Sequence, residues 1–191
     1  MSLISDEELK VIVEKVVHRT MTENPSKAVG TDASDVTDPK AIALGADHGG
    51  YKMKEMLKGH LASAGYRIID CGTDSTESVD YPDFARAVAE KVSSQTAWRG
   101  IIVDGAGIGS CMTANKVNGV RAAMCHDHAT AVNSREHNDA NVLTLGAGLL
   151  GDNLAIQIVD TWLTTEFAGG RHSRRVEKII AVEQRAVKAG N

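Results

Sequence analysis

The chain has 191 residues, of which 42% are apolar and 24% charged, as in a globular domain with a full core and an additional segment. A formal net charge of −4 argues against nucleic acid or an anionic membrane as a partner. No apolar run is long enough to span a bilayer, and the three cysteines fit neither a disulfide framework nor a metal motif. We therefore expect a cytoplasmic protein that binds any anionic ligand through local features.

Residues 1–22 predict a short amphipathic helix. Ser5 and Glu8 form an S-x-x-E capping box. The apolar residues that follow fall on one face of the helix, at Leu9, Ile12, Val13, Val16 and Val17. A helix this short is marginal in water unless that face is covered. Residues 23–39 are rich in Pro, Gly, Ser, Thr and Asp without apolar periodicity, which predicts a linker.

Residues 40–191 alternate between strand and helix patterns. Short apolar runs predict five strands that begin near residues 41, 66, 100, 120 and 141. Helical spacing is found at 51–65, near 83, 110 and 128, and at 151–164 and 172–188. This alternation favours an α/β fold in which helices cover both faces of a parallel sheet. Ligands of such folds bind beyond the carboxyl ends of the strands.

Polar residues follow the predicted strands at those ends. Asp47 and His48 follow the first strand, and a glycine-rich turn, "DGAGIGS", follows the third. The turn does not have the G-x-G-x-x-G spacing of a dinucleotide site, because Ser110 occupies the last place. It also lies in the third unit rather than the first, which argues against a nicotinamide or flavin cofactor. Each polar pair could instead be an ordinary turn or helix cap.

Five motifs in order carry a resemblance to a known family. They are "GADHGGYKMKE", "IDCGTDSTESVDYPDFA", "GAGIGSCMTANKVNGVRAA", "NSREHNDANVLTLGA" and "GGRHSRRVEKI". Together they resemble the type B ribose-5-phosphate isomerases, a family that includes galactose-6-phosphate isomerase subunits, over about residues 40–187. The resemblance implies a Rossmann-like three-layer sandwich with a five-stranded parallel sheet. It also implies a homodimer or tetramer with shared active sites, and no metal or organic cofactor.

The chemistry implied by the resemblance is aldose–ketose isomerisation of a phosphosugar through an enediolate. This reaction needs a base, donors for the developing oxyanion and a phosphate clamp. The glycine loop, with Gly105, Gly107 and Gly109, supplies backbone N–H groups for the oxyanion. His137 matches the family's ring-opening histidine.

The resemblance also implies a set of substrate contacts, at Asp47, His48, Tyr81, Ser110, Asn115, Asn138, Arg171, His172 and Arg175. Arg171, His172 and Arg175 match the end that binds phosphate, and are expected to reach the site of a partner subunit. Arginine suits this task because its planar guanidinium meets phosphate oxygens in pairs.

Several positions depart from the family pattern. Asp104 stands where most members have a cysteine base, and Ala106 where a threonine helps the oxyanion site. Gly148 replaces an arginine used on phosphate, and Ser110 stands where some relatives use a glutamate base. Cys111 is expected to be a buried small residue. We interpret Asp104 as a carboxylate base; the rival interpretation is a helix cap without catalysis.

These departures leave the substrate and the activity open. Because one phosphate-binding arginine is missing, the substrate could be a tetrose, pentose or hexose phosphate other than ribose-5-phosphate. The chain could also be an inactive paralogue that binds sugar phosphates, or a dimeric scaffold. Activity on a panel of phosphosugars separates these alternatives.

The leading segment has two interpretations. It could pack on its own domain or in a dimer contact. It also resembles the encapsulation peptides that load enzymes into bacterial microcompartments, where a helix docks on a shell protein. On that interpretation residues 5–21 bind shell proteins, and the enzyme resides inside a microcompartment.

Overall fold

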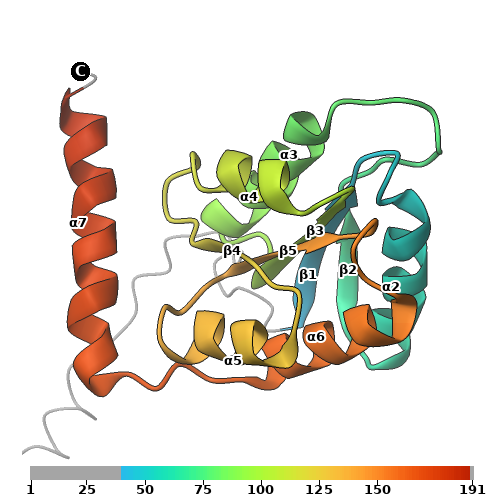
Figure 1. Ribbon diagram of the computed structural model, residues 1–191. Coiled ribbons are helices and arrows are strands. Elements are labelled where there is room, and N and C mark those ends of the chain that lie inside the picture. The colour runs from blue at the N-terminus through green and yellow to red at the C-terminus, as the bar shows by residue number, and fades with distance from the viewer. Residues whose placement is uncertain (1–39, 190–191) are drawn as a thin grey trace, which may run out of the picture. The chain divides into compact units, whose positions relative to one another are not determined.

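Five parallel strands form the central sheet of the computed structural model, which describes residues 40–189 (Figure 1). The strand order is β2-β1-β3-β5-β4. The strands are β1 (Ala41–Ala46), β2 (Arg67–Asp70), β3 (Arg99–Asp104), β4 (Ala122–Met124) and β5 (Val142–Gly146). The helices are α2 (Tyr51–Ser63), α3 (Tyr81–Ser93), α4 (Ile108–Ala114), α5 (His128–Glu136), α6 (Asp152–Thr164), η1 (Gly170–His172) and α7 (Ser173–Ala189).

Helices cover both faces of the sheet, which confirms the expected three-layer α/β sandwich (Figure 1). On one face, apolar side chains of α2, α5 and α6 pack on the sheet around the fully buried Trp162. On the other face α3 and α4 pack through small residues and valines, among them Ala85, Val88 and Ala114. The predicted helix over residues 1–22 and the predicted linker over 23–39 lie outside the described residues.

Two element boundaries differ from the sequence expectation, and each has a local cause. Helix α3 begins at Tyr81 rather than near Asp83, because Pro82 occupies the first turn, where its missing N–H costs nothing. Strand β4 begins at Ala122 rather than 120. The N–H of Arg121 donates to the Oδ1 atom of Asn141 at 2.7 Å, so at this position a side-chain acceptor takes the place of the backbone acceptor of a strand pair.

The strand order reverses direction between β1 and β3, and this is the crevice where open α/β sheets bind ligands. The carboxyl ends of the two strands lie side by side, with Ala46 opposite Val103. The N–H of Asp47 donates to the carbonyl of Val103 at 3.2 Å, which continues the pairing one residue beyond β1. The residues after β1 and β3 are therefore held next to each other.

Helix α7 stands apart from the two helical layers (Figure 1). It follows η1 directly, and η1 is the element that it contacts most. One hydrogen bond joins it to the loop before β4, from the N–H of Gly119 to the Oε1 atom of Glu183 at 2.6 Å. Its apolar Ile179 and Val182 are exposed. None of the helices described within residues 40–189 is long and apolar enough to cross a membrane.

Candidate active site

Asp47 and His48 fix the tip of β1. Asp47 is only 8% exposed, and its Oδ1 atom accepts the N–H of Gly50 at 2.9 Å at the start of α2. The Nδ1 atom of His48 lies 3.1 Å from the carbonyl oxygen and 3.2 Å from the amide nitrogen of Val79. Both residues therefore hold the crevice together.

Tyr81 lies directly over the glycine loop. A Cβ atom placed on Gly109 would come within 2.4 Å of the Cζ atom of Tyr81, so only glycine lets the phenol ring lie on the loop. Tyr81 is nevertheless 39% exposed, which leaves the ring accessible to a substrate. Helix α3 thus brings its first residue to the same place as the turn after β3.

Asp104 is buried at the end of β3 and faces the backbone of the turn that follows it. Its Oδ1 atom accepts the N–H groups of Ala106, at 2.8 Å, and of Gly107. Its Oδ2 atom accepts the N–H of Ser110, at 3.0 Å. The carboxylate therefore caps the first turn of α4, and it takes up backbone donors that the sequence assigned to a substrate oxyanion. An ionised carboxylate offers about four acceptor positions, so one remains on Oδ2.

The glycine loop is anchored from below as well. Gly107 has a φ angle of +78°, a left-handed conformation that suits glycine. The buried hydroxyl of Thr144 on β5 donates to the carbonyl of Gly107 at 2.8 Å. At the first two positions of α4, the N–H groups of Ile108 and Gly109 have no intrahelical acceptor. Asp104 does not accept these two donors.

Gly148 packs closely against the backbone of the glycine loop, so this position does more than lack the arginine side chain. Its N–H donates to the carbonyl of Gly105 at 2.9 Å. A Cβ atom at this position would lie 2.9 Å from the same carbonyl oxygen, closer than such atoms approach in proteins. An arginine at 148 would therefore require the backbone to shift.

A second group of predicted residues gathers where α5 ends and η1 begins. The rings of His137 and His172 stack in parallel, with centroids 4.2 Å apart and an interplanar angle of 6°. The Nε atom of Arg171 donates to the Nε2 atom of His172 at 3.3 Å. Burial lowers the pKa of His172, and the neighbouring His137, Arg171 and Arg175 lower it further. Arg171 and Arg175 are exposed.

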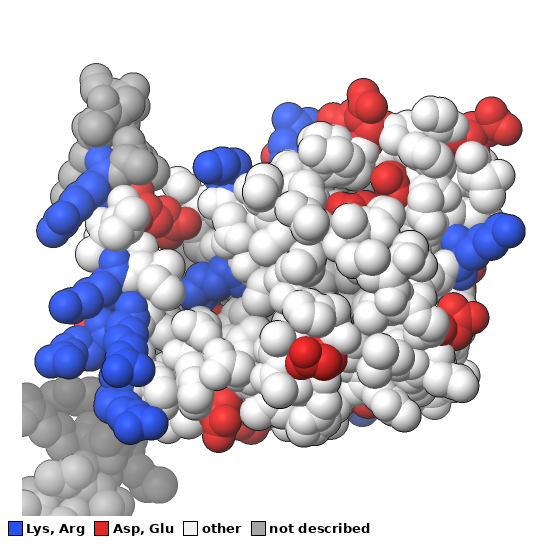
Figure 2. Space-filling view, in the orientation of Figure 1, with Lys and Arg blue, Asp and Glu red and all other residues white. Residues whose placement is uncertain are grey.

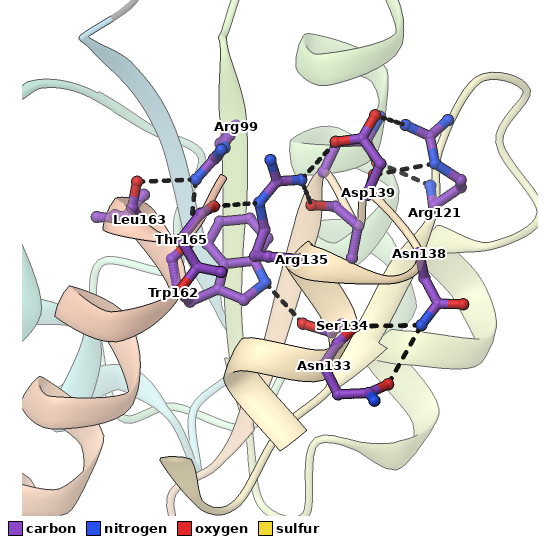
Figure 3. Close-up of polar contacts among 12 residues, drawn as sticks. Arg99, Arg121, Asn133, Ser134, Arg135, Asn138, Asp139, Trp162, Leu163 and Thr165 are labelled. Carbon is purple, nitrogen blue, oxygen red and sulfur yellow. Dashed lines mark hydrogen bonds and ion pairs between the residues drawn. The ribbon is translucent and has the colours of Figure 1, made fainter. Parts of the chain in front are cut away.

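Buried arginines hold the end of α5 in place (Figure 3). Arg135 is 4% exposed, and its Nη1 atom donates to the Oδ1 atom of Asp139 at 2.7 Å and to the carbonyl of Ala140 at 2.6 Å. Arg99 donates to the last carbonyls of α6, at Trp162 and Leu163. Burial, with Arg135 nearby, lowers the pKa of Arg99 to about 10, which leaves it charged at neutral pH. This network gives the residues that follow α5 a rigid base.

The two groups lie at opposite edges of the sheet within one chain. Because β4 and β5 are parallel, α5 must return the chain from the carboxyl edge to the amino edge. Nine helical residues span about 13 Å at 1.5 Å per residue. We use the name carboxyl-edge group for Asp47, His48, Tyr81, Asp104 and Gly105 to Ser110. The name α5–η1 group denotes His137, Asn138, Arg171, His172 and Arg175.

Asn115 joins neither group as a free ligand-binding side chain. It follows α4, which also returns the chain to the amino edge. Its amide donates to the carbonyls of Cys111 and Ala122 and accepts the N–H of Ala122, with all three distances between 2.9 and 3.0 Å. Asn115 therefore joins α4 to β4, and the substrate contact expected there stays a prediction. Cys111 is half-buried, and burial raises the pKa of its thiol, which suits the expected packing role.

Asn133 and Thr144 were missed by sequence reasoning. Asn133 precedes His137 by four residues on α5, and their side chains lie 2.8 Å apart. The i,i+4 spacing was a usable signal, because such residues are neighbours on one helix face. The role of Thr144 under the loop had no signal, because nothing in the sequence fixes which β5 residue faces Gly107. Within residues 40–189, no cluster of three or more His, Cys, Asp or Glu side chains could hold a metal ion.

Comparisons with known proteins show the family to which the chain is similar. The model of the ribose/galactose isomerase family matches residues 42–179. The ribose-5-phosphate isomerase B of Escherichia coli is 45% identical over 146 residues, which are 76% of this chain and 98% of the relative. A D-erythrulose-4-phosphate isomerase of Pectobacterium atrosepticum is 42% identical over 140 residues, 73% of this chain and 92% of the relative.

A solved structure, the ribose-5-phosphate isomerase B of Clostridium thermocellum, superposes with a TM-score of 0.76 at 51% identity, covering 76% of this chain and 99% of that chain. The fold and the ordered motifs therefore define an enzyme that interconverts aldose and ketose phosphates. The chain belongs to the ribose/galactose isomerase family.

Proposed function

We propose that this enzyme isomerises a phosphorylated sugar of the ribose-5-phosphate type in active sites that two subunits share. The observation that carries the proposal is the separation of the two groups. The carboxyl-edge group offers a carboxylate and oxyanion donors, whereas the cations that suit a phosphate lie at the other edge. A complete site then requires the α5–η1 group of a second copy in a homodimer or a tetramer.

Asp104 is the proposed base. Its remaining acceptor position on Oδ2 takes the proton from the carbon beside the substrate carbonyl. The C–H electron pair forms the C=C bond of the enediolate, and the carbonyl electrons move onto its oxygen. The N–H groups of Ile108 and Gly109 stabilise that oxyanion. The hydroxyl proton of the second oxygen moves to the first oxygen, the new C=O bond forms at the second oxygen, and return of the proton from Asp104 to the neighbouring carbon completes the isomerisation.

The α5–η1 group is proposed to bind the phosphate and open the sugar ring. Arg171 in η1 and Arg175 in the first turn of α7 are exposed, and Figure 2 shows Lys and Arg side chains gathered along α7. Such a basic segment attracts a phosphate ester and can meet it bidentately. His137, with 38% of its side chain exposed, lies beside these cations and can donate a proton to the ring oxygen.

The substrate is proposed to be ribose-5-phosphate or a close relative. The Escherichia coli relative is named for ribose-5-phosphate and the Pectobacterium relative for a tetrose phosphate. The close fit at Gly148 argues for a clamp that lacks the additional arginine, which is compatible with a shorter or differently placed substrate.

A panel of tetrose, pentose and hexose phosphates tests the proposed function. We expect turnover of at least one aldose phosphate, measured by the appearance of the ketose. Binding without turnover, seen by calorimetry, would instead support the inactive sugar-phosphate-binding paralogue. Absence of both would support the scaffold.

We also propose that residues 1–22 target the enzyme to a microcompartment shell. The family model matches residues 42–179, and this chain covers 98% of the Escherichia coli relative and 99% of the Clostridium thermocellum structure. The leading segment is therefore additional to what these proteins share with this chain. Its capping box and apolar face suit docking as a helix. A fluorescent protein fused to residues 1–22 should be recruited to a shell. Val13→Glu with Val16→Glu should abolish recruitment, and diffuse fluorescence of the unaltered fusion would refute the proposal.

A further inference from the structure

The side chain of Asn133 contacts one ring nitrogen of His137, Nδ1, whereas the other, Nε2, lies 3.8 Å from the Oε2 atom of Glu136. The Nδ2 atom of Asn133 lies 2.8 Å from the Nδ1 atom of His137. An amide nitrogen can only donate, so Nδ1 of His137 accepts. A neutral imidazole with an accepting Nδ1 carries its proton on Nε2. The contact therefore selects the tautomer that can donate from Nε2.

Asn138 fixes which way the Asn133 amide is turned (Figure 3). The Nδ2 atom of Asn138 donates to the main-chain carbonyl of Asn133 at 3.3 Å and to its Oδ1 atom at 3.4 Å. If the Asn133 amide were reversed, its NH₂ group would face the NH₂ group of Asn138, and its oxygen would face His137. That arrangement sets a donor against a donor, so the network favours a single orientation.

His172 fixes the plane of the same ring. It stacks on His137 at 4.2 Å and is 6% exposed, and its Nδ1 atom has no hydrogen-bond partner among the described residues. Its Nε2 atom accepts from Arg171, so in the neutral ring the proton is on Nδ1. A neutral partner can stack closely on His137 without charge repulsion. The His137 ring is thus held on one edge by Asn133 and on one face by His172.

We propose that Asn133 is a positioning residue that holds His137 as the Nε2–H tautomer, with Asn138 orienting its amide and His172 fixing the ring plane. The Nε2–H group is thereby ready to donate to the ring oxygen of a cyclic sugar phosphate. The catalytic consequence rests on the proposed function, whereas the tautomer itself does not. Because the Asn133 amide already contacts Nδ1, His137 needs no carboxylate partner at that nitrogen.

Nitrogen NMR of the full-length protein labelled in its histidines tests the tautomer without any substrate. The His137 signals are identified by their loss in His137→Asn. In the unaltered protein at a pH where His137 is neutral, we expect the proton on Nε2. Asn133→Asp has nearly the same shape but accepts instead of donating, so it should move the proton to Nδ1. Asn133→Leu removes the partner and should give a mixture of both tautomers.

Asn153→Asp is the matched control, because it makes the same charge change at an exposed position of α6. It should leave the His137 tautomer unchanged. A proton on Nδ1 in the unaltered protein would overturn the proposal. An unchanged tautomer in both Asn133 variants would overturn it as well, whatever the enzyme's activity.

Kinetics test the consequence for ring opening. Ribose-5-phosphate is mainly cyclic, whereas erythrose-4-phosphate cannot close a five-membered ring because its O4 carries the phosphate. Asn133→Asp should lower kcat/KM for ribose-5-phosphate at least about tenfold, a part of the 10²–10⁴ that acid–base catalysis contributes. It should leave turnover of erythrose-4-phosphate unchanged wherever the unaltered enzyme accepts it. Equal loss on both substrates would assign Asn133 a merely structural role.

Discussion

The carboxyl-edge group and the α5–η1 group are built in opposite ways. In the first, a buried carboxylate is held by N–H groups of its own turn, and the turn is tied to β5 by Thr144 and to the β5–α6 loop by Gly148. In the second, the cations that matter are exposed at the end of a helix that stands apart from the sandwich. On the proposed function, removal of the carbon-bound proton falls to the first group, and phosphate binding and ring opening fall to the second, which must reach another subunit.

The largest expected effect follows from Asp104→Asn. If Asp104 removes the substrate proton, kcat should fall at least about a hundredfold, the low end for losing a general base. The variant also sets an amide NH₂ against a backbone N–H of the loop, which should cost about 1–3 kcal/mol of unfolding free energy. Kinetics and urea denaturation measured together separate the two effects.

Cys111→Ala is the control for that experiment, because the half-buried Cys111 thiol lies in the same turn and has no proposed chemical role. It should retain nearly normal kcat. Near-normal turnover in Asp104→Asn, with the expected loss of stability, would show that the carboxylate is only a helix cap.

Gly109→Ala tests the contact between the loop and Tyr81. The added methyl group would come within 2.4 Å of the phenol ring, so either the ring or the loop must move. A displacement of about 1 Å at a reacting centre can cost up to a hundredfold, and we expect kcat/KM to fall about tenfold or more. Gly59→Ala, where nothing lies within 4 Å of the added atom, should leave kcat/KM unchanged. Equal behaviour of the two variants would remove Tyr81 from the site.

The phosphate clamp should be disrupted by Arg171→Ala. Loss of a charged hydrogen bond to phosphate should raise KM about tenfold or more, with a smaller change in kcat. Arg174→Ala removes a neighbouring exposed arginine that lies outside the α5–η1 group, and serves as the control. Steady-state kinetics give both constants. A large fall in kcat at constant KM would mean that Arg171 acts on the transition state instead.

The smallest effect concerns Asp70, which ends β2 at the carboxyl edge. Burial acts to raise its pKa, but hydrogen bonds from Lys54 and Lys58 and from the N–H of Gly72 outweigh it and lower the pKa to about 2. The ion pairs therefore stabilise the fold above the ordinary pKa of 3.8, and that contribution is lost as the pH falls toward 2. Asp70→Asn should be less stable than the unaltered protein at pH 7. In urea denaturation the difference should shrink below about pH 4.

The sequence predicts the sandwich well because apolar periodicity is strong in every strand and in the helices between them. The shared site stays a prediction, and it was expected only from the family resemblance. Two features were not decided by the sequence. The Asp104 carboxylate folds back onto its own turn, a cap that was only the rival interpretation, and the Asn115 amide is used to join α4 to β4. Both depend on where a short polar side chain finds backbone partners, which residue spacing does not determine.

The central claim is that each active site takes one group from each of two subunits, and complementation tests it directly. Asp104→Asn and His137→Asn should each be nearly inactive alone. In a mixed dimer, one site carries both changes and the other carries neither. Equal mixing after joint refolding should then restore about a quarter of normal activity, because half of the dimers have one intact site out of two. If both groups served the same subunit's site, every site in the mixture would carry one change, and activity would stay at the level of the inactive variants.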